Sequence, residues 1–398
     1  MKIVAILENS IDSGGGFNQA LSAIVQMNRL KKNIFSFSVL TSNKDNIAIL
    51  KSLGIDAKIF KKSFLDKVVA GLSTNELTRR LQQKIKLIGS LEKKLIKMGC
   101  DLVYFVTPSS RVSSLQTINY ILTVWDNSHR DSPEFPEVRN FGEYQRREYI
   151  YSNYISGAYF TIVDSSQLAS KISTRYGIDK ERLLVMPFSI NPMMESKSKE
   201  VPSIKSTLSL YKIDKGYFFY PAQFWPHKNH VRILEALALL RDEGKIYQVV
   251  FVGGKKGNLK HIKTLIKRLH LSNQVEILGF VDSAHMPALY GACSAVIMPT
   301  YFGYTNIPPI EAWSFNKPLV YSSLFAEQAQ GSALLFNPDD ERELADAMSR
   351  SLEQDVSRPL VENGKKRLEE LELSRKESEE NMKVRLNQYK KRLKCWKI

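Results

Sequence analysis

The sequence predicts an α/β protein made of two doubly wound domains in succession. Short apolar segments alternate with helical patterns in two separate runs, and this alternation is typical of parallel sheets whose strands are joined by helices. The length of 398 residues exceeds what one ordinary hydrophobic core organises. A strand at Ile3–Leu7, a glycine-rich turn and a helical pattern open the first run. Strand, glycine loop and helix together form the first unit of a βαβ fold.

The remaining elements follow in order along each run. In the first run, strands are predicted at Phe35–Leu40, Ala57–Phe60, Leu102–Val106, Ile121–Val124, Tyr159–Val163 and Leu183–Met186. In the second run, strands are predicted at Tyr217–Tyr220, Val249–Val252, Val275–Leu278, Ala295–Met298 and Leu319–Tyr321, with helices such as Val231–Arg241 and Leu259–Leu269 between them. A polar stretch after Pro187, interrupted by Pro192 and Pro202, connects the runs. We therefore predict an N-terminal domain at 1–195, a C-terminal domain at 196–370, and a basic helix at 371–398 that packs on the N-terminal domain or on a membrane.

The formal net charge of +16 calls for an anionic partner. Between Lys58 and Lys97 there are eleven Lys or Arg against three acids, and leucines and isoleucines recur at helical spacing, which predicts a basic amphipathic helix. The last sixteen residues carry seven basic residues and no acid. Helices of this composition favour an anionic membrane surface, although solvated faces of ordinary helices explain them equally well. No nucleic acid is predicted as a partner, because no recognisable DNA- or RNA-binding motif is present.

Cysteine usage and hydropathy indicate the compartment. Cys100, Cys293 and Cys395 are odd in number and lack metal-ligand spacing, which fits a reducing environment. No apolar run approaches the roughly 18 residues that span a bilayer, and the opening MKIVAIL is too short for the core of a signal peptide. We expect a cytoplasmic protein, peripheral at the inner face of a membrane.

Glycine-rich loops follow two of the predicted strands. In SGGGFNQ, Gly14, Gly15 and Gly16 precede a helix, where backbone N–H groups and the helix dipole favour an anion. A tight turn without a ligand is the alternative, and the spacing is not that of a dinucleotide fingerprint. The second loop, FVGGKKG, could form the floor of a nucleotide pocket around Gly254 or be a plain turn with solvated lysines.

Two further loops offer polar groups at the starts of helices. Lys228 in YPAQFWPHKNH lies just before a helix, a natural place for an ammonium to meet a diphosphate. The spacing of His227 and His230 does not suit a metal site. In TYFGYTNIPPIEA, the prolines predict a helix that begins near Pro309, so Thr305 and Asn306 would face phosphate or sugar oxygens. Glu311 could then accept hydrogen bonds from a diol such as ribose, or simply complement the helix dipole.

Taken together, these motifs resemble those of glycosyltransferase family 4, the glycosyl transferases group 1 type with the GT-B fold. The resemblance rests on GGG after the first strand, PAQFWPHKNH, FVGG, LGFV, PTYFGYTNIPPIEAW and KPLV, and it is strongest from Tyr220 to Pro338. It implies two Rossmann-like domains facing across a cleft, with the acceptor on the N-terminal domain and a nucleotide-diphosphate sugar on the C-terminal one. It further implies transfer with retention at the anomeric carbon, no cofactor and no metal.

The resemblance also assigns roles to individual residues. It implies that the donor contacts Gln223, Lys228, Gly254, Gly303, Tyr304, Thr305, Asn306, Ile307 and Glu311, and that Gly14–Gly16 lines the cleft. The sequence departs from the family pattern at three of its positions: Gln223 replaces an arginine, Gly303 a glutamate and Trp125 a histidine. Besides Lys228, the catalytic residues are predicted to be Asp126 and His129, the latter as a substitute imidazole.

The function predicted is transfer of a sugar from a nucleotide-diphosphate donor to a hydroxyl of a lipid-linked or growing surface polysaccharide of the O-antigen or capsule type. Two alternatives remain open at this point. A non-catalytic scaffold of the same fold would account for Trp125 and Gly303, and a nucleotide-sugar epimerase would act on the donor without an acceptor. The departures favour an active subgroup with its own donor preference, because Lys228 and Glu311 are retained.

Overall fold

The computed structural model describes residues 1–11, 14–31, 34–61, 63–72, 78, 80, 82, 84–85, 87–190 and 202–396. The chain divides into two compact units. The first comprises Met1–Pro133, Val138–Pro187 and Ser374–Ile398, and the second comprises Glu134–Glu137 and Phe188–Leu373. The predicted boundary between residues 195 and 196 lies outside the described residues.

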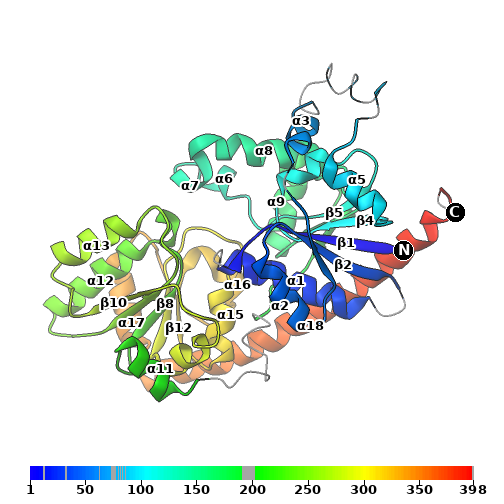
Figure 1. Cartoon of the computed structure of the whole chain (residues 1–398). Helices are drawn as coiled ribbons and strands as arrows, with labels where there is room; N and C mark the ends of the chain where they lie inside the picture. Colours follow the sequence, from blue (N-terminus) through cyan, green and yellow to red (C-terminus); the bar gives the residue numbers. More distant parts are fainter. Residues whose placement is uncertain are drawn as a thin grey trace. The chain divides into compact units, whose positions relative to one another are not determined.

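The first unit is built on a seven-stranded parallel sheet with the order β3-β2-β1-β4-β5-β6-β7 (Figure 1). Its strands are β1 (Lys2–Leu7), β2 (Ser36–Thr41), β3 (Ala57–Ile59), β4 (Leu102–Phe105), β5 (Asn119–Thr123), β6 (Thr161–Val163) and β7 (Leu183–Val185). The strands read as apolar runs because helices cover both faces of a parallel sheet. All seven predicted strands of the first run are confirmed within two residues.

The helices of the first unit follow its strands in the predicted alternation. They are α1 (Gly15–Leu30), α2 (Asp45–Ser52), α3 (Phe64–Leu72), α5 (Ser90–Lys97), α6 (Ser128–Asp131), α7 (Pro136–Arg139), α8 (Glu143–Tyr154) and α9 (Ser166–Tyr176), with short 3-10 turns η2 (Ser110–Ser114), η3 (Asn140–Gly142) and η4 (Lys180–Arg182). Part of α7 belongs to the second unit, since Glu134–Glu137 is counted there.

The second unit has a six-stranded parallel sheet with the order β10-β9-β8-β11-β12-β13. Its strands are β8 (Phe218–Pro221), β9 (Val249–Val252), β10 (Val275–Gly279), β11 (Ala295–Met298), β12 (Leu319–Ser322) and β13 (Leu334–Phe336). The predicted strands of the second run are confirmed, whereas β13 was not predicted.

The helices of the second unit cover its sheet on both faces. They are α11 (Ile204–Tyr211), α12 (His230–Asp242), α13 (Leu259–Arg268), α14 (Met286–Ala292), α15 (Ile307–Ser314), α16 (Ala326–Ala329), α17 (Glu341–Arg350) and the first half of α18 (Gln354–Leu393), with turns η5 (Pro226–Lys228) and η6 (Ser323–Phe325). Helix α18 continues into the first unit from Ser374 onward. Helix α12 packs against both α13 and α17 (Figure 1), and α11 packs against α14.

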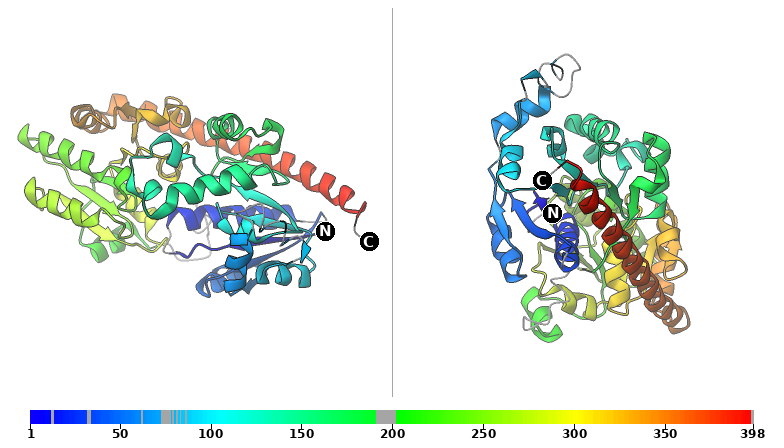
Figure 2. Two further views of the ribbon diagram at one scale, coloured as in Figure 1. Left: turned by 90° about the horizontal axis from the view of Figure 1, so that it is seen from above. Right: turned by 90° about the vertical axis from the view of Figure 1, so that its right-hand side faces the viewer.

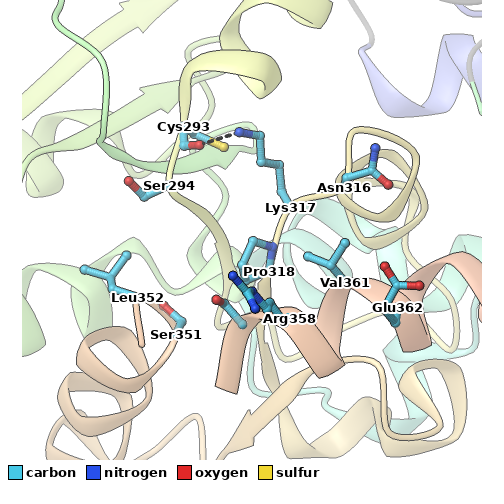
Figure 3. Close-up of a pocket in the computed structure, with 11 residues that line it drawn as sticks. Cys293, Ser294, Asn316, Lys317, Pro318, Ser351, Leu352, Arg358, Val361 and Glu362 are labelled. Carbon is cyan, nitrogen blue, oxygen red and sulfur yellow. Dashed lines mark hydrogen bonds between the residues drawn. The ribbon is translucent and has the colours of Figure 1, made fainter. Parts of the chain in front are cut away.

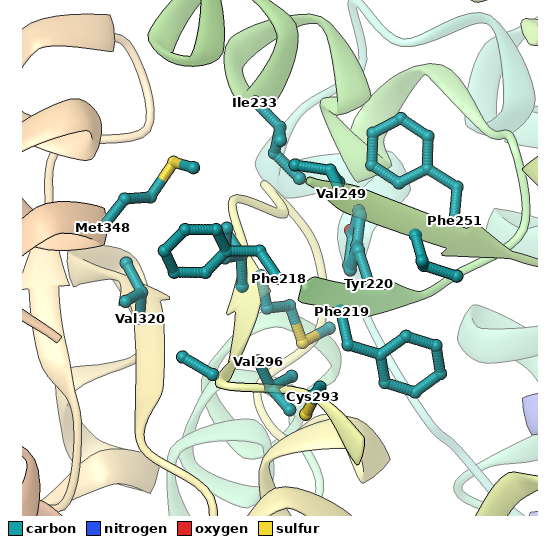
Figure 4. Packing of buried hydrophobic residues seen from close by; sticks show 14 of the residues in the cluster. Phe218, Phe219, Tyr220, Ile233, Val249, Phe251, Cys293, Val296, Val320 and Met348 are labelled. Carbon is teal, nitrogen blue, oxygen red and sulfur yellow. The ribbon is translucent and has the colours of Figure 1, made fainter. Parts of the chain in front are cut away.

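The core of the second unit is aromatic along β8. Phe218, Phe219 and Tyr220 are fully buried and alternate between the two faces of the sheet (Figure 4). Val249 and Phe251 on β9 continue this layer on one side, and Val296 and Val320 continue it on the other. In both sheets the strand order reverses beside the first strand, between β8 and β11 here and between β1 and β4 in the first unit. Open α/β sheets bind ligands beyond the carboxyl ends of the strands at such a reversal.

Two predictions about basic helices are corrected. The segment from Lys58 to Lys97 is not one amphipathic helix, because it contains strand residues at its start and the separate helices α3 and α5, while Leu77 and Leu81 lie outside the described residues. The C-terminal helix is longer than predicted, since α18 is a single helix of 40 residues (Figure 2). No helix in the described part of the chain is both long and apolar enough to cross a membrane.

The C-terminal half of α18 buries its apolar face within the first unit. Leu386 and Tyr389 are almost fully buried, and the Tyr389 hydroxyl donates to the carbonyl oxygen of Asp101 at 2.8 Å. The apolar residues that were predicted to face a membrane are therefore divided. Val384 and Trp396 remain exposed, as does the basic side chain of Lys391.

Candidate functional site

Two loops at the carboxyl edge of the second sheet bring Lys228 and Asn306 together. The β8 loop (residues 222–229) contains η5, and the β11 loop (residues 299–306) ends where α15 begins. Lys228 Nζ donates to Asn306 Oδ1 at 3.4 Å across 78 residues of sequence. The backbone also joins the loops, because the N–H of Tyr301 donates to the carbonyl oxygen of His227 at 2.9 Å. Lys228 thus lies near the strand-order reversal between β8 and β11, where open α/β sheets bind ligands.

A glycine pair after β9 closes one side of the β8 loop. A Cβ on Gly253 would lie 2.2 Å from the carbonyl oxygen of Ala222, so only glycine permits this approach of the two backbones. A Cβ on Gly254 would meet Gln223 Nε2 at 3.6 Å, so Gly254 and Gln223 are neighbours. The Gln223 side chain accepts a hydrogen bond from the Trp225 indole at 3.1 Å, and the ammonium of Lys256 lies 5.5 Å from the Trp225 ring.

Asn306 belongs to a buried amide and hydroxyl network. Its backbone N–H donates to Gln328 Oε1 at 2.8 Å, and its side-chain Nδ2 donates to the Tyr321 hydroxyl at 2.8 Å. Gln328 Nε2 returns a bond to the Asn306 carbonyl oxygen at 2.7 Å. The backbone N–H of Asn306 is thus used within the protein and does not point toward a ligand. Its Oδ1, which accepts from Lys228, is the atom that faces the β8 loop.

The helix after the β11 loop also starts earlier than predicted. Helix α15 begins at Ile307 with Asn306 as its N-cap, and Pro308 and Pro309 lie within its first turn rather than before it. Proline fits there because the first-turn N–H groups have no partner inside the helix. The earlier start places Glu311 one turn inside the helix, where it is buried.

Glu311 is engaged by a buried tyrosine. The Tyr290 hydroxyl donates to Glu311 Oε2 at 2.6 Å. Burial raises the pKa of Glu311 to about 7, and the bond from Tyr290 opposes this only in part. The carboxyl group therefore exchanges its proton near neutral pH. Its predicted role as an acceptor for a ribose diol stays a prediction.

Gly303 has a backbone conformation that side chains rarely adopt. Its φ is +100°, and a Cβ there would lie 3.0 Å from Asn306 Oδ1. A glutamate at this position would strain the loop and press on the atom that contacts Lys228. Gly303 is therefore part of the geometry of the β11 loop in this chain. Its neighbours Tyr304 and Ile307 are buried and half-buried respectively, and Thr305 is half-buried.

A carboxylate that the sequence analysis missed contacts the β8 loop. Glu137 Oε1 accepts from the backbone N–H of His227 at 2.9 Å and also contacts Nδ1 of the same residue. The His227 ring is stacked on Phe302, with 4.2 Å between ring centroids and 10° between planes. Glu137 is 90 residues from His227 in the chain and has no motif around it, so no local signal could have identified it.

The second histidine of the motif is a core residue. His230 is fully buried and stacked on Phe224 at 4.5 Å, and burial lowers its pKa to about 3. His227 and His230 thus have different surroundings. The described part of the chain contains no group of three or more His, Cys, Asp or Glu that could hold a metal ion.

In the first unit, the glycine loop lies beside Trp125. Gly14 has a φ of +60° and precedes α1, which starts at Gly15. A Cβ on Gly16 would meet Asn9 Nδ2 at 3.1 Å and the Trp125 ring at 3.5 Å. The structure therefore brings together the glycine loop after β1 and the tryptophan after β5, as expected for the carboxyl edge of a parallel sheet.

Asp126 is paired with an arginine in the same unit. Arg147 Nη1 donates to Asp126 Oδ1 at 2.7 Å, and the N–H of Ser128 donates to the same oxygen at 2.9 Å. Burial works to raise the pKa of Asp126, but the Arg147 charge and the Ser128 bonds outweigh it, so the pKa lies below its ordinary value. Asp126 is thus an ionised partner of Arg147 rather than a base poised near neutral pH.

The prediction that His129 supplies a catalytic imidazole is wrong. Its side chain is completely buried, its Nε2 lies 3.2 Å from Glu148 Oε2 and 3.4 Å from the Tyr176 hydroxyl, and burial lowers its pKa. His129 lies in helix α6 and its ring is packed against Glu148 and Tyr151 rather than exposed beside Asp126. His129 cannot meet a substrate from this position.

Two further features of the first unit were not predicted. Glu8, directly after β1, accepts hydrogen bonds from Ser109 and from the Arg111 guanidinium. A cavity of about 530 Å³ lies near the end of β3 and the start of α5, where its lining includes Lys61, Ser90 and Lys94. The sequence shows that Lys61 follows a short strand, but only the fold shows that Lys61 and Lys94 line the same cavity.

A cavity of about 540 Å³ in the second unit lies away from the β8 and β11 loops. Figure 3 shows its lining between the start of β12 and the first turns of α18, including Lys317 and Arg358. The Lys317 ammonium donates to the carbonyl oxygens of Gly291 and Cys293 at 2.9 and 2.8 Å. None of the predicted site residues lines this cavity.

Comparison with known proteins finds similarities that lie mainly in the second unit. Residues 209–367 match the family described as glycosyl transferases group 1. The chain is 28% identical over 203 residues to the O-antigen chain mannosyltransferase RfbU of Salmonella typhimurium, covering 48% of this chain and 51% of that one. It is 26% identical over 150 residues to the O-antigen chain mannosyltransferase B of Escherichia coli, covering 37% and 39%. The matches thus span about half, or less, of these curated relatives.

The fold extends the likeness to the whole chain. The crystal structure of Anabaena Alr3699/HepE in complex with UDP-glucose matches with a TM-score of 0.71 at 18% identity, covering 96% of this chain and 100% of that one. The predicted pair of Rossmann-like domains, the fold of GT-B glycosyltransferases, is therefore confirmed. Residues 209–367, less than half of the chain, are similar to the glycosyl transferases group 1 family.

Proposed function

We propose that this protein is a glycosyltransferase that moves a sugar from a nucleotide-diphosphate donor to a hydroxyl of a lipid-linked or growing surface polysaccharide. The observation that carries the proposal is the contact between Lys228 and Asn306 at the carboxyl edge of the second sheet, within the region that matches the family. A lysine ammonium beside a helix start suits the phosphates of a donor. The names of the two curated relatives support a polysaccharide acceptor of the O-antigen type.

The proposed mechanism is mainly electrostatic. Lys228 would stabilise the diphosphate as it leaves, because negative charge develops there in the transition state. The glycosidic bond to the diphosphate breaks, the acceptor oxygen bonds to the anomeric carbon, and the acceptor proton passes to an oxygen of the leaving diphosphate. Retention of configuration follows when attack and departure share one face of the sugar. This route needs no strong protein base, which agrees with the pairing of Asp126 with Arg147 and the burial of His129.

The acceptor would bind at the carboxyl edge of the first sheet. There the glycine loop, Trp125 and the cavity beside Lys61 and Lys94 offer an aromatic surface, small residues and positive charge. An acceptor that carries a lipid diphosphate matches these groups. The exposed basic residues near the end of α18 support the further proposal that the protein binds an anionic membrane surface at the cytoplasmic side. No cofactor or metal is part of the proposed reaction.

A direct test is binding followed by transfer. Calorimetric titration with UDP, GDP, ADP, CMP and dTDP identifies the base, and the matching nucleotide sugars are then incubated with lipid-linked acceptor extracts. We expect one nucleoside diphosphate to bind and its sugar to be transferred with release of that diphosphate. An epimerase would instead convert the donor without an acceptor. Absence of binding by every nucleotide would contradict the proposal and favour a non-catalytic scaffold.

A further inference from the structure

The contact between Glu137 and His227 is a buried carboxylate–imidazole pair next to Lys228. The side chains of Glu137 and His227 are only 7% and 12% exposed. Burial works to raise the pKa of Glu137, but the bonds from the His227 side chain and backbone outweigh it, so this carboxyl group is ionised at neutral pH. A buried carboxylate is costly unless a positive group accompanies it. An ionised carboxylate in contact with an imidazole favours the protonated ring.

The surroundings of His227 hold the ring in one orientation. Phe302 is stacked on one face of the ring, and Phe135 contacts Phe302 edge-on at 4.9 Å between centroids. The charged or titratable groups around the ring are Glu137 from α7, the adjacent Lys228 in η5, and His230 at the start of α12. His230 is neutral because burial lowers its pKa to about 3. Of these groups, Glu137 carries the negative charge beside the ring and Lys228 the positive one.

We infer that Glu137 holds His227 as a second cationic group beside Lys228, and that the two consecutive residues of the η5 turn together recognise a diphosphate. This inference rests on the proposed function, because the diphosphate is that of the nucleotide-sugar donor. His227 is the binding residue, and Glu137 is a positioning residue that acts through it. The carboxylate selects the charged ring and, with Phe302, fixes its plane.

One oxygen of Glu137 indicates that this residue does more than attach Glu134–Glu137 to the β8 loop. Among the described residues, Glu137 Oε2 is a buried oxygen without a hydrogen-bond partner. A residue that merely anchored Glu134–Glu137 to the β8 loop would gain stability by satisfying both oxygens, or by being apolar. The chain instead keeps an ionised carboxylate there. A carboxylate that keeps the His227 ring protonated explains why a buried charge is retained at this position.

The test compares diphosphate recognition among matched variants. Affinities for the nucleoside diphosphate and for the corresponding nucleoside are measured by calorimetry on the full chain with Glu137→Gln, His227→Gln, His227→Arg and Phe135→Leu. Phe135→Leu loosens the same segment on Phe302 and leaves the charges in place. Thermal unfolding of each variant verifies that it is folded, and only folded variants enter the comparison.

We expect Glu137→Gln and His227→Gln each to weaken diphosphate binding about tenfold or more, the scale of one charge-assisted hydrogen bond, while nucleoside binding changes little. His227→Arg should retain the affinity of the native protein. The pH dependence of diphosphate affinity should distinguish the role of Glu137 from that of His227. In the native chain the affinity falls as pH rises and His227 loses its proton, and in Glu137→Gln this fall should occur at a lower pH. His227→Gln and His227→Arg should show only the titration of the phosphate.

Two results would overturn the inference. One is an unchanged ratio of diphosphate to nucleoside affinity, within about twofold, in both Glu137→Gln and His227→Gln. The other is an equal loss of diphosphate affinity in Phe135→Leu, which would make the contact a fastening of the segment. Failure of the native chain to bind any nucleoside diphosphate is a different outcome, since it refutes the proposed function and this inference together.

Discussion

The carboxyl edges of the two sheets differ in how their charged side chains are paired. At the edge of the first sheet, each acidic residue that we describe is matched by an arginine of the same unit: Glu8 by Arg111, Asp126 by Arg147 and Glu148 by Arg130. At the edge of the second sheet, Lys228 donates to the neutral oxygen of Asn306, and Glu311 accepts from an uncharged tyrosine.

This difference indicates which edge is built to bind a charged ligand. A carboxylate already paired with an arginine adds little attraction for a further ion. A lysine ammonium beside the start of a helix, as at the second edge, attracts phosphate. The second edge therefore suits a diphosphate. At the first edge, the glycine loop and Trp125 suit the neutral sugar part of an acceptor, and the positive charge lies farther off, at Lys61 and Lys94 beside the cavity.

The largest expected effect tests the second edge. Lys228→Ala should lower kcat/KM for sugar transfer by at least about 100-fold, roughly 3 kcal/mol, because it removes a group that stabilises the leaving diphosphate. Lys260→Ala on α13 removes an exposed lysine of the same unit and should change kcat/KM less than about twofold. Equal kcat/KM values for Lys228→Ala and Lys260→Ala would contradict the proposal that the second edge binds the diphosphate.

The next prediction concerns the proton on Glu311. Because burial raises the folded-state pKa to about 7, the folded protein keeps a proton that the unfolded chain loses near its ordinary pKa of 4.5. Stability of the native protein should therefore fall as pH rises from about 4.5 to 7. Glu311→Gln mimics the protonated group and should raise the unfolding free energy at pH 8 by up to about 3 kcal/mol. Urea titrations at pH 4.5 and 8 measure this, and equal slopes with pH in both proteins would contradict it.

The third prediction tests the paired charges of the first edge. The Arg130 guanidinium, which donates to both carboxylate oxygens, lowers the pKa of Glu148 to about 2. A depressed folded-state pKa adds stability that is complete above the unfolded value near 4.5 and is lost as pH falls toward 2. Glu148→Gln should reduce the unfolding free energy at pH 6 by about 1–2 kcal/mol, since the pair is partly exposed. The deficit should shrink when both proteins are compared at pH 3, and a constant deficit would argue against the pairing.

The smallest expected effect concerns the glycine loop of the first edge. Gly16→Ala presses on Asn9 and Trp125 by a few tenths of an ångström and should lower the unfolding free energy by no more than about 1 kcal/mol. If this edge holds the acceptor, KM for the acceptor should rise a few-fold while KM for the donor stays constant. Gly71→Ala is the control, because a Cβ there meets nothing within 4 Å. A rise in donor KM alone would indicate that the first edge binds the donor rather than the acceptor.

Local sequence patterns were sufficient for the strands and for the motifs that follow them. Apolar runs such as Val249–Val252 and Ala295–Met298 match the structure residue for residue, since a strand buried on both faces must be apolar throughout. Lys228 and Gly254 were found because both lie in loops directly after such strands. The proline pair placed the start of α15 to within two residues.

The tertiary structure decided which polar groups are available to a ligand. His129 is three residues from Asp126 in the sequence, yet it is buried against Glu148, and the N–H of Asn306 is taken by Gln328. Glu137 reaches His227 from 90 residues away. The sequence by itself determined the α/β class, the alternation of elements and the loops that carry the motifs, because hydrophobic periodicity and turn chemistry are local. The partner of each charge was decided only by the packed fold, because pairing depends on contacts between residues distant in the chain.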